Sequence, residues 1–337
     1  MTPTKVIYDT DPGVDDAMAL YFALAHPALD VVGITTTFGN VTVQQAATNA
    51  LYLCALAGYS HIPVTQGVAK PQVKHAEPPP DFIHGADGLG NVPVRHNTAG
   101  MSALDPRSSA QFIVDMAKAS PGDITLVAVG PLGNVSEALK LEPALPQLLK
   151  SLVIMGGTVS EPGNVSPVAE ANIWNDPHAA DHVFGAGFDM TMVGLDVTHR
   201  VVAELALIEK IAQHHQHPAT ETLRHAVDFY AEFYSGLHTS ITTKGCFAHD
   251  LLAFVYVVAP ELFGTQSGPI RVATEGIANG QTMMARRDGN AYPQQGWGNG
   301  RKPTRVCMSV DAPGCMNLFE QSLMNPNWLA PFTHTSS

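Results

Sequence analysis

The chain has 337 residues, of which 45% are hydrophobic and 14% are charged, and its formal net charge at pH 7 is −12. This length suffices for one large α/β domain with an extensive core. The negative charge argues against a nucleic-acid polymer or an anionic membrane as partner, but it is compatible with a small neutral substrate.

The cysteines and the hydropathy pattern favour a cytoplasmic protein. Cys54, Cys246, Cys307 and Cys315 lie far apart and lack the CxxC spacing of metal sites, so we expect reduced thiols. No apolar run reaches about 18 residues, the length needed to cross a membrane. The first strand is expected directly after the N-terminal residues, so no signal peptide is predicted.

Apolar, β-favouring runs alternate with amphipathic segments along the chain. We expect strands over 6–8, 31–38, 62–65, 124–129, 152–157 and 190–196, with peripheral strands over 270–273, 283–285 and 306–310. Helices are expected from residue 17, over 41–57, up to 141, from 176, over 204–240 and over 251–258. The alternation predicts parallel βαβ units, and hence a single α/β domain over 1–337 with a mainly parallel, Rossmann-like central sheet flanked by helices.

One acidic stretch follows the first predicted strand. Asp9, Asp11, Asp15 and Asp16 fall at a strand end, in the turn made by Pro12 and Gly13, and in the first turn of a helix. In an open α/β sheet, ligands bind at this edge. A single Asp before a helix is usually a cap, but a helix N-terminus cannot offset the mutual repulsion of four acids. A cation is therefore the expected partner.

Two later segments carry further candidates. Asn164, Glu170 and Asn172 lie in a stretch bracketed by Gly and Pro, and their side chains suit the hydroxyls of a ribose. Tyr230 and Tyr234 are i,i+4 neighbours on a helix, which allows either a wall for a planar base or ordinary core packing.

Two histidine-containing segments are less specific. The long irregular segment over 70–98 is typical of a functional lid or of disorder, and its His84 is either a ligand-facing or an exposed loop residue. His214, His215 and His217 precede Pro218, and we interpret them as the solvated end of a helix rather than as a metal site.

The stretch Asp-Thr-Asp-Pro-Gly-Val-Asp-Asp resembles the N-terminal signature of the nucleoside hydrolases, the inosine-uridine preferring N-ribohydrolase family. The resemblance continues to about Val310 and implies calcium-dependent cleavage of ribonucleosides to base and ribose, by a homo-oligomer that is a dimer or tetramer. It implies that Asp11, Asp16, Asp250 and the Val129 carbonyl bind Ca²⁺, and that Asp15 is the general base. Asp9 is left with an orienting role.

The same resemblance implies a set of residues around the nucleoside. His249 is placed near the leaving base, and the remaining contacts are Asn40, His84, Met155, Asn164, Glu170, Asn172, Tyr230 and Tyr234. Purine-specific relatives carry Trp directly before the last calcium carboxylate, whereas this chain has His249 before Asp250. That difference favours acceptance of pyrimidine nucleosides.

Two other functions fit parts of the sequence. Asp9-Thr10-Asp11 after an apolar strand is similar to the motif of HAD-type phosphatases, in which Asp9 would be the nucleophile and magnesium the metal. Gly13 stands where that motif has Thr or Val, and the Asp15-Asp16 pair has no role in it. A non-catalytic calcium- or sugar-binding module is the third interpretation. The segment 286–303 with Trp297 has no interpretation from sequence.

Overall fold

The computed structural model describes residues 2–93, 95, 101–235, 243–286, 292, 297 and 300–330. Within these residues, a nine-stranded sheet has the order β10-β13-β7-β6-β5-β1-β2-β3-β4. All its neighbouring strands are parallel except β10 and β13. The strands are β1 (Thr4–Thr10), β2 (Leu29–Thr36), β3 (Val64–Gln66), β4 (Asp105–Ser108), β5 (Ile124–Ala128), β6 (Ser151–Met155), β7 (Met190–Val193), β10 (Phe263–Gly268) and β13 (Thr304–Val310).

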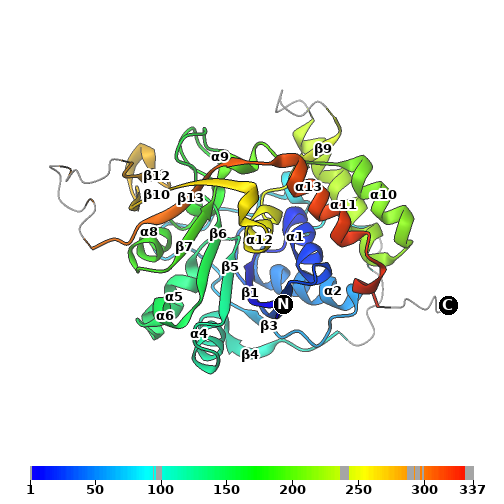
Figure 1. The fold of residues 1–337 in the computed structure, drawn as a ribbon, viewed down its shortest axis with the longest axis horizontal. Coiled ribbons are helices and arrows are strands. Elements are labelled where there is room, and N and C mark those ends of the chain that lie inside the picture. The colour runs from blue at the N-terminus through cyan, green and yellow to red at the C-terminus, as the bar shows by residue number, and fades with distance from the viewer. Residues whose placement is uncertain are drawn as a thin grey trace.

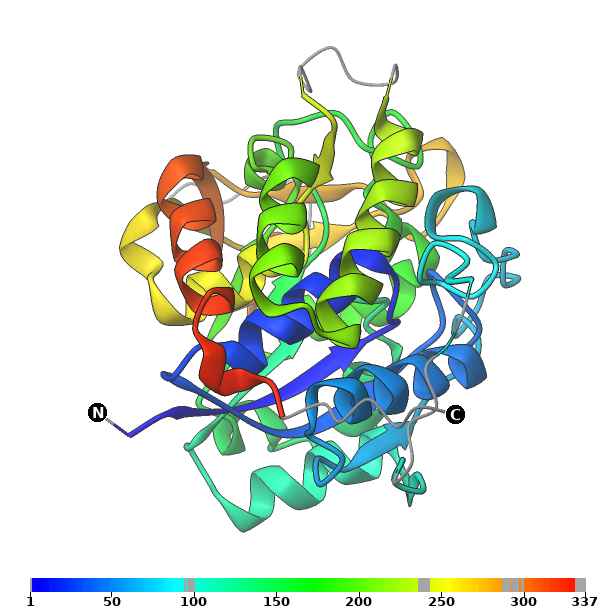
Figure 2. The same cartoon turned by 90° about the vertical axis from the view of Figure 1, so that its right-hand side faces the viewer.

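Helices cover both faces of this sheet, as Figure 1 shows. One face packs against α1 (Val14–Ala25), α2 (Val43–Ala57), α11 (Pro218–Tyr234), α12 (Leu251–Val258) and α13 (Ala312–Leu323). The other packs against α4 (Ser109–Ala119), α5 (Gly133–Leu141), α6 (Leu145–Leu148) and α8 (Pro177–Gly185). The central strand alternates between the two cores, with Val6 and Tyr8 in one and Ile7 in the other, as the twofold period of a strand requires. Figure 2 shows the first layer, with α11 beside α10 (Leu205–His215).

The strand order reverses beside β1. The chain moves outward from β1 through β2 and β3 to β4, and then crosses back to β5 on the other side of β1. Asp9, near the carboxyl end of β1, is in register with Thr35 of β2 and Ala128 of β5. At such a switch point the connections diverge to opposite faces of the sheet and leave a crevice at the carboxyl edge. The acidic stretch therefore lies at the position where an open α/β sheet binds ligands.

Most predicted elements are confirmed to within a few residues, and the differences have local causes. The strand predicted over 190–196 ends at Val193, because Gly194 begins the single turn α9 (Leu195–Thr198). The helix predicted over 204–240 is interrupted before Pro218, where α11 begins; residues 236–240 lie outside the described part. The strand around 306–310 is not peripheral, since β13 pairs with β7 in the main sheet.

The interpretation of the histidine cluster is wrong for one of its members. His217 is buried and caps α11, its Nδ1 accepting a hydrogen bond from the Ala219 N–H (3.1 Å). The Nε2 of the part-buried His215 lies 2.5 Å from the Leu323 carbonyl oxygen. The carbonyls of Leu323 and Ala330, near the C-terminus, contact His215 and His217, so at these two residues the helix end is covered and not solvated as predicted.

Two small antiparallel pairs complete the described strands. β8 (Val202–Glu204) pairs with β9 (Gly245–Phe247), and β11 (Ile270–Val272) pairs with β12 (Thr282–Met284). The β8–β9 pair matters for function, because the chain that leaves β9 leads directly into the start of α12.

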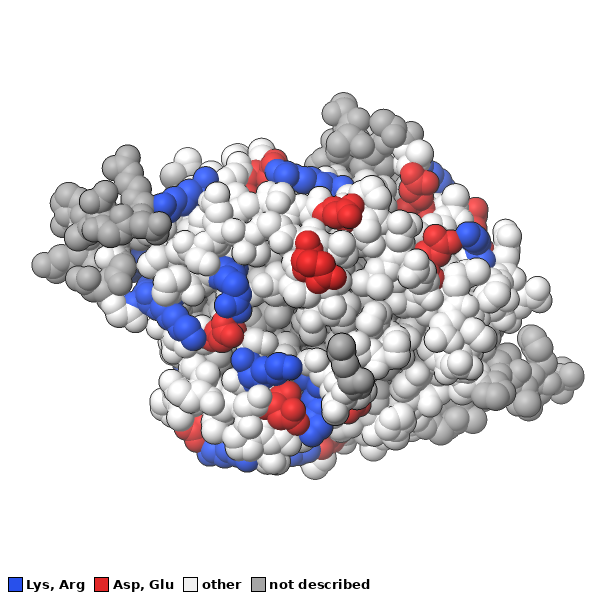
Figure 3. All heavy atoms as spheres, viewed as in Figure 1, with Lys and Arg blue, Asp and Glu red and all other residues white. Residues whose placement is uncertain are grey.

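Charges are dispersed on the face of the molecule in Figure 3, where basic and acidic residues alternate between wide uncharged areas. Several charged residues of the protein form ion pairs, for example Arg305 with Asp189 (2.7 Å) and Lys118 with Glu142 (2.6 Å). A nucleic-acid interface needs a concentrated basic patch, and this face offers none. Among the described residues, no helix combines the length and apolar character that crossing a bilayer requires.

The contact between β2 and α4 leads to a stability prediction. A Cβ added at Gly33 would lie 2.4 Å from ring atoms of the fully buried Phe112. We expect Gly33→Ala to lower the free energy of unfolding by about 1–3 kcal/mol, since the ring has no free volume into which to move. Urea denaturation measures this. Gly185→Ala is the matched control, because its added Cβ would have its nearest contacts at 3.4 Å or more, on the side chain of Arg301. Equal stability of the two variants would contradict the prediction.

Candidate active site

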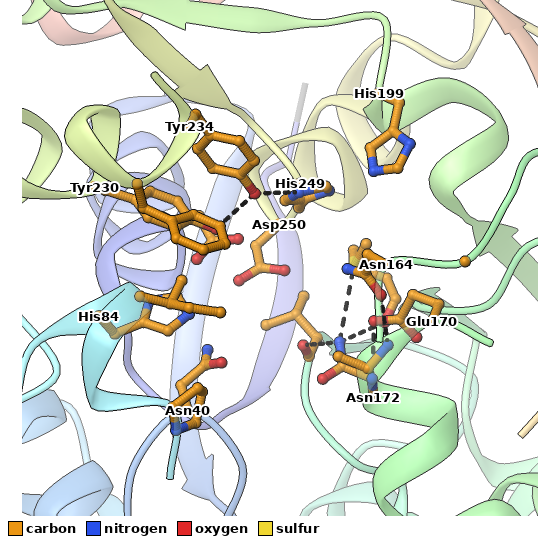
Figure 4. Close-up of a pocket in the computed structure, with 18 residues that line it drawn as sticks. Asn40, His84, Asn164, Glu170, Asn172, His199, Tyr230, Tyr234, His249 and Asp250 are labelled. Atoms are coloured by element: carbon orange, nitrogen blue, oxygen red, sulfur yellow. Dashed lines mark hydrogen bonds between the residues drawn. The ribbon is translucent and has the colours of Figure 1, made fainter. Parts of the chain in front are cut away.

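A pocket of about 330 Å³ opens at the carboxyl edge of the sheet, over the switch point. It contains the side chains from both halves of the chain that Figure 4 shows, with His84, Tyr230 and Tyr234 on one side and Asn164, Glu170 and Asn172 on the other. Of the site residues predicted from sequence, those that line it are Asp15, Asn40, His84, Val129, Met155, Asn164, Glu170, Asn172, Tyr230, Tyr234, His249 and Asp250. Asp11 and Asp16 lie beneath them, fully or almost fully buried.

The turn between β1 and α1 fixes the acidic residues. Gly13 is the N-cap of α1 in an extended conformation, and its N–H donates to Asp16 Oδ2 (2.9 Å). Asp16 Oδ1 accepts from Thr10 Oγ1 (2.5 Å), and its Oδ2 also accepts from Asn40 Nδ2 (3.0 Å). The Asn40 N–H donates to Asp11 Oδ2 (2.7 Å). The loop after β2 therefore holds the loop after β1.

Three carboxylates converge at the floor of the pocket. Asp15, Asp16 and Asp250 each place an oxygen within 4.8 Å of the other two, and all three side chains are buried. Burial, and then the charge of Asp16, raises the pKa of Asp11 and of Asp15 well above the ordinary value. Burial and the charges of Asp15, Asp16 and Asp11 do the same for the pKa of Asp250. Like charges at this spacing need a cation or protons to neutralise them.

Two oxygens at this floor lack a protein partner. Within the described part of the chain, Asp11 Oδ1 and Asp15 Oδ1 are buried and accept no hydrogen bond. A buried carboxylate oxygen without a donor is costly, so these atoms fit the ligand set of a hard cation. The strand end of β5 contributes the Val129 carbonyl, to which Asn172 Nδ2 donates (2.6 Å), and a carbonyl oxygen retains a second lone pair for a metal.

Asp9 lies behind this floor and does not line the pocket. Its Oδ1 accepts from Thr35 Oγ1 (2.5 Å) and Asn134 Nδ2 (2.7 Å). Burial raises the pKa of Asp9 to about 6, although both hydrogen bonds oppose that shift. This arrangement suits a supporting residue. It does not suit the accessible nucleophile that the phosphatase interpretation needs.

The polar side opposite the aromatic residues is rigid. Glu170 caps α7 (Ala171–Asn175) and accepts from the N–H groups of Gly157 (2.8 Å), Asn172 (2.8 Å) and Ile173 (3.1 Å). Burial raises the pKa of Glu170, and the three N–H donors counter that effect. Asn164 Oδ1 accepts from the Ala171 N–H (3.0 Å). Hydrogen bonds to the backbone therefore fix the positions of these side chains.

His84 is a buried member of the pocket wall, which settles the alternative left open by the sequence. It ends the short helix α3 (Asp81–His84) with 4% of its surface exposed, and its ring centroid lies 5.0 Å from that of Tyr230. Burial lowers the pKa of His84 to about 3, so the ring is neutral. Its Nδ1 accepts from the Val14 N–H (3.3 Å), which places the proton on Nε2 and makes that atom a donor.

A chain of hydrogen bonds runs along the same side of the pocket. Tyr230 OH lies 3.2 Å from Tyr234 OH, which lies 3.1 Å from His249 Nε2. His249 Nδ1 in turn lies 2.8 Å from Thr198 Oγ1. Burial is the first cause that raises the pKa of both tyrosines, so they remain protonated.

Several pocket residues were not predicted from sequence. Pro80, Ile83, Gly163, Ala171, His199 and Phe233 complete the lining. For His199, the available signal was its place shortly after the strand predicted over 190–196. Two further aromatic residues, Phe82 and Trp297, are not in the lining. Phe82 is 68% exposed beside Phe233, and the ring of Trp297 packs near Tyr292.

Comparison with known proteins assigns this chain to one family. The family model described as inosine-uridine preferring nucleoside hydrolase matches residues 6–317. A probable uridine nucleosidase 1 from Oryza sativa subsp. japonica is 38% identical over 327 residues, which are 96% of this chain and 97% of the relative.

Solved structures agree. A plant nucleoside hydrolase matches with a TM-score of 0.89 at 35% identity, covering 96% of this chain and 100% of its own. A purine-preferring ribonucleoside hydrolase from Gardnerella vaginalis matches with a TM-score of 0.86 at 33% identity, covering 95% and 98%. The chain therefore belongs to the inosine-uridine preferring nucleoside hydrolase family, and its reaction is hydrolysis of the N-glycosidic bond of ribonucleosides.

Proposed function

We propose that this enzyme is a calcium-dependent ribonucleoside hydrolase that accepts pyrimidine nucleosides and inosine. The observation that carries the proposal is the meeting, in one pocket, of a buried carboxylate cluster, a rigid polar side and an aromatic side that contains histidines. Each part matches one portion of a nucleoside: the reacting carbon and its water, the ribose hydroxyls, and the base.

The proposed calcium ligands are Asp11, Asp16, Asp250 and the Val129 carbonyl. Support comes from the unpartnered Asp11 oxygen, from the raised pKa of the buried acids, and from a donor set made only of oxygens. When bound, calcium would neutralise this cluster, orient the ribose diol and make a nearby water easier to deprotonate.

Asp15 is the proposed general base. Its carboxylate is part of the convergent trio, lines the pocket and has one buried oxygen without a partner. In the proposed reaction, a water oxygen attacks C1′ of the ribose and gives its proton to Asp15. The bond from C1′ to the base nitrogen breaks, and its electron pair leaves with the base, which then takes up a proton. Asn164, Glu170 and Asn172 hold the sugar hydroxyls while charge develops at C1′.

The base is proposed to lie along the side formed by His84, Tyr230, Tyr234 and His249. His84 Nε2–H offers a donor, and His249 with the two tyrosines offers a hydrogen-bonded chain for stabilising the departing base. No tryptophan lines the pocket among the described residues. Stacking is worth about 1–3 kcal/mol per base, so we infer a relaxed preference between purines and pyrimidines. Relatives named uridine nucleosidases support this inference.

The proposal also includes the biological form of the enzyme. We infer a homo-oligomer, either a dimer or a tetramer, because the family resemblance implies one. We infer a cytoplasmic location because the cysteines are free thiols. Light scattering on purified protein measures the oligomeric state.

The first functional prediction concerns substrates. Purified enzyme should release ribose from uridine, cytidine and inosine, with kcat/KM for uridine at least comparable to that for inosine. A reducing-sugar assay across uridine, cytidine, inosine and adenosine tests this, with 4-nitrophenyl phosphate as the control for phosphatase activity. A purine preference above about a hundredfold, close to 3 kcal/mol, would contradict the specificity. Cleavage of phosphate esters alone would refute the reaction.

The second prediction separates the base from the metal ligands. Asp15→Asn should lower kcat by about 10²–10⁴-fold, the usual cost of losing a general base, while retaining calcium. Asp250→Asn should weaken calcium binding itself. Isothermal titration with calcium, run beside the uridine assay, distinguishes the two variants. Loss of calcium from the Asp15 variant would instead make Asp15 a ligand.

The third prediction links calcium to pH. The buried carboxylates have folded-state pKa values above those of the unfolded chain, where Asp titrates near about 3.9. Their protonated forms therefore favour the metal-free fold at low pH, and this contribution is lost as pH rises through the raised values. Calcium competes with these protons, so the rise in Tm that it causes should be larger at about pH 7.5 than at about pH 5. Scanning fluorimetry with calcium or a chelator measures it, and Asp250→Asn should show little effect at either pH.

A further inference from the structure

The imidazole of His249 is held by both of its nitrogens. Nε2 lies 3.1 Å from the hydroxyl of Tyr234, on the pocket side, and Nδ1 lies 2.8 Å from Thr198 Oγ1, away from it. Thr198 is fully buried, and His249 is 5% exposed. Figure 4 shows the His249 ring beside Tyr234 at the edge of the pocket. The proposed mechanism gives a task to the Nε2 side of this ring and none to the threonine.

The backbone fixes both partners of this hydrogen bond to one frame. Thr198 ends α9, the single turn that follows β7, and its N–H donates to the Gly194 carbonyl (3.1 Å). The Ala248 N–H, directly before His249, donates to the Val201 carbonyl (3.0 Å), next to the β8–β9 pair. The ring also lies edge-on to Phe247 and His199, at centroid distances of 5.7 Å and 5.6 Å. The segment that carries the threonine hydroxyl is thus joined by backbone hydrogen bonds to the segment that carries His249.

We propose that Thr198 is a positioning residue for His249: its hydroxyl holds Nδ1, and thereby keeps Nε2 directed at the tyrosine pair and the departing base. The inference rests on the proposed role of His249 beside the base. Which ring nitrogen of a histidine faces a reaction is set by the hydrogen bond that the other nitrogen makes. A threonine hydroxyl is suited to this, because it can donate to Nδ1 or accept from it and so keeps the ring held in either tautomer.

The consequence depends on the leaving group. A nucleoside base departs poorly unless a proton or hydrogen-bond donor meets its nitrogen, whereas the phenolate of 4-nitrophenyl β-D-ribofuranoside departs without one. Both substrates share the ribose and need the same attack at C1′. A residue that acts only by holding His249 should therefore matter for uridine and not for the aryl riboside.

The experiment compares Thr198→Val, which keeps the side-chain shape and removes the hydroxyl, with Thr198→Ser, which keeps the hydroxyl. The valine variant should lose at least about tenfold in kcat for uridine, as expected when a catalytic group is misplaced, and less than about twofold for the aryl riboside. The serine variant should recover most of the uridine activity. Thr125→Val is the matched control, a buried threonine on β5 that hydrogen-bonds Ser151 and should leave both activities unchanged.

Each other outcome has a defined meaning. Equal losses on the two substrates, or no loss on either, would overturn the inference, as would a serine variant as slow on uridine as the valine one. Circular dichroism reports folding. If the valine variant does not fold, Thr198→Cys replaces it, since a thiol hydrogen-bonds weakly, and the same split between substrates is expected. If the wild-type enzyme cleaves neither riboside, the proposed function is refuted. If the wild type is active but the valine variant loses the same activity on both substrates, only the role of Thr198 is refuted.

Discussion

The repulsion among buried carboxylates at the end of β1 is the constraint on which the site depends. Asp11, Asp15 and Asp16 come from one strand-turn-helix connection, and Asp250 is brought to them by the start of α12. Hydrogen bonds from Thr10, Gly13 and Asn40 satisfy part of this charge, but two buried oxygens remain without donors. A fold that leaves such a cluster unneutralised would be unstable near neutral pH, so metal binding and stability are coupled in this protein.

The two sides of the pocket around this cluster differ in how their side chains are held. On the side proposed to bind the sugar, the carboxylate of Glu170 accepts from three backbone N–H groups, and Asn172 donates to the Val129 and Met155 carbonyls. On the side proposed to bind the base, the links are between side chains, from Tyr230 through Tyr234 to His249 and Thr198. A ribose is the same in every ribonucleoside, whereas the bases differ in size and polarity. Fixed contacts for the sugar and a hydroxyl-lined side for the base match that difference.

Gly39 and Gly130 leave room for the carboxylate of Asp11 because they have no side chains. A Cβ at Gly130, in the loop that follows β5, would lie 2.6 Å from Asp11 Oδ1, and one at Gly39 would overlap the other oxygen of the same carboxylate. The strand ends on both sides of β1 therefore close around Asp11 without side chains. Because of this close packing, Asp11 lies beneath the floor of the pocket although its side chain does not line the pocket.

The sequence by itself determined the alternation of strands and helices and the carboxyl-edge location of the acidic stretch, whereas most pocket residues were named through the resemblance to the nucleoside hydrolases. It could do so because apolar runs such as 124–129 and 251–258 report burial directly, and because four acids at a strand end have few structural uses. It missed β4, a partly exposed strand at the sheet edge with the sequence Asp-Pro-Arg-Ser, which carries no apolar alternation. Only the tertiary structure decided that His84 is buried and neutral, that Asp9 lies outside the pocket lining and accepts a hydrogen bond from Thr35, and that Thr198 hydrogen-bonds His249. Those facts depend on contacts between segments from 26 to 70 residues apart, and no local pattern records which nitrogen or oxygen such a contact will occupy.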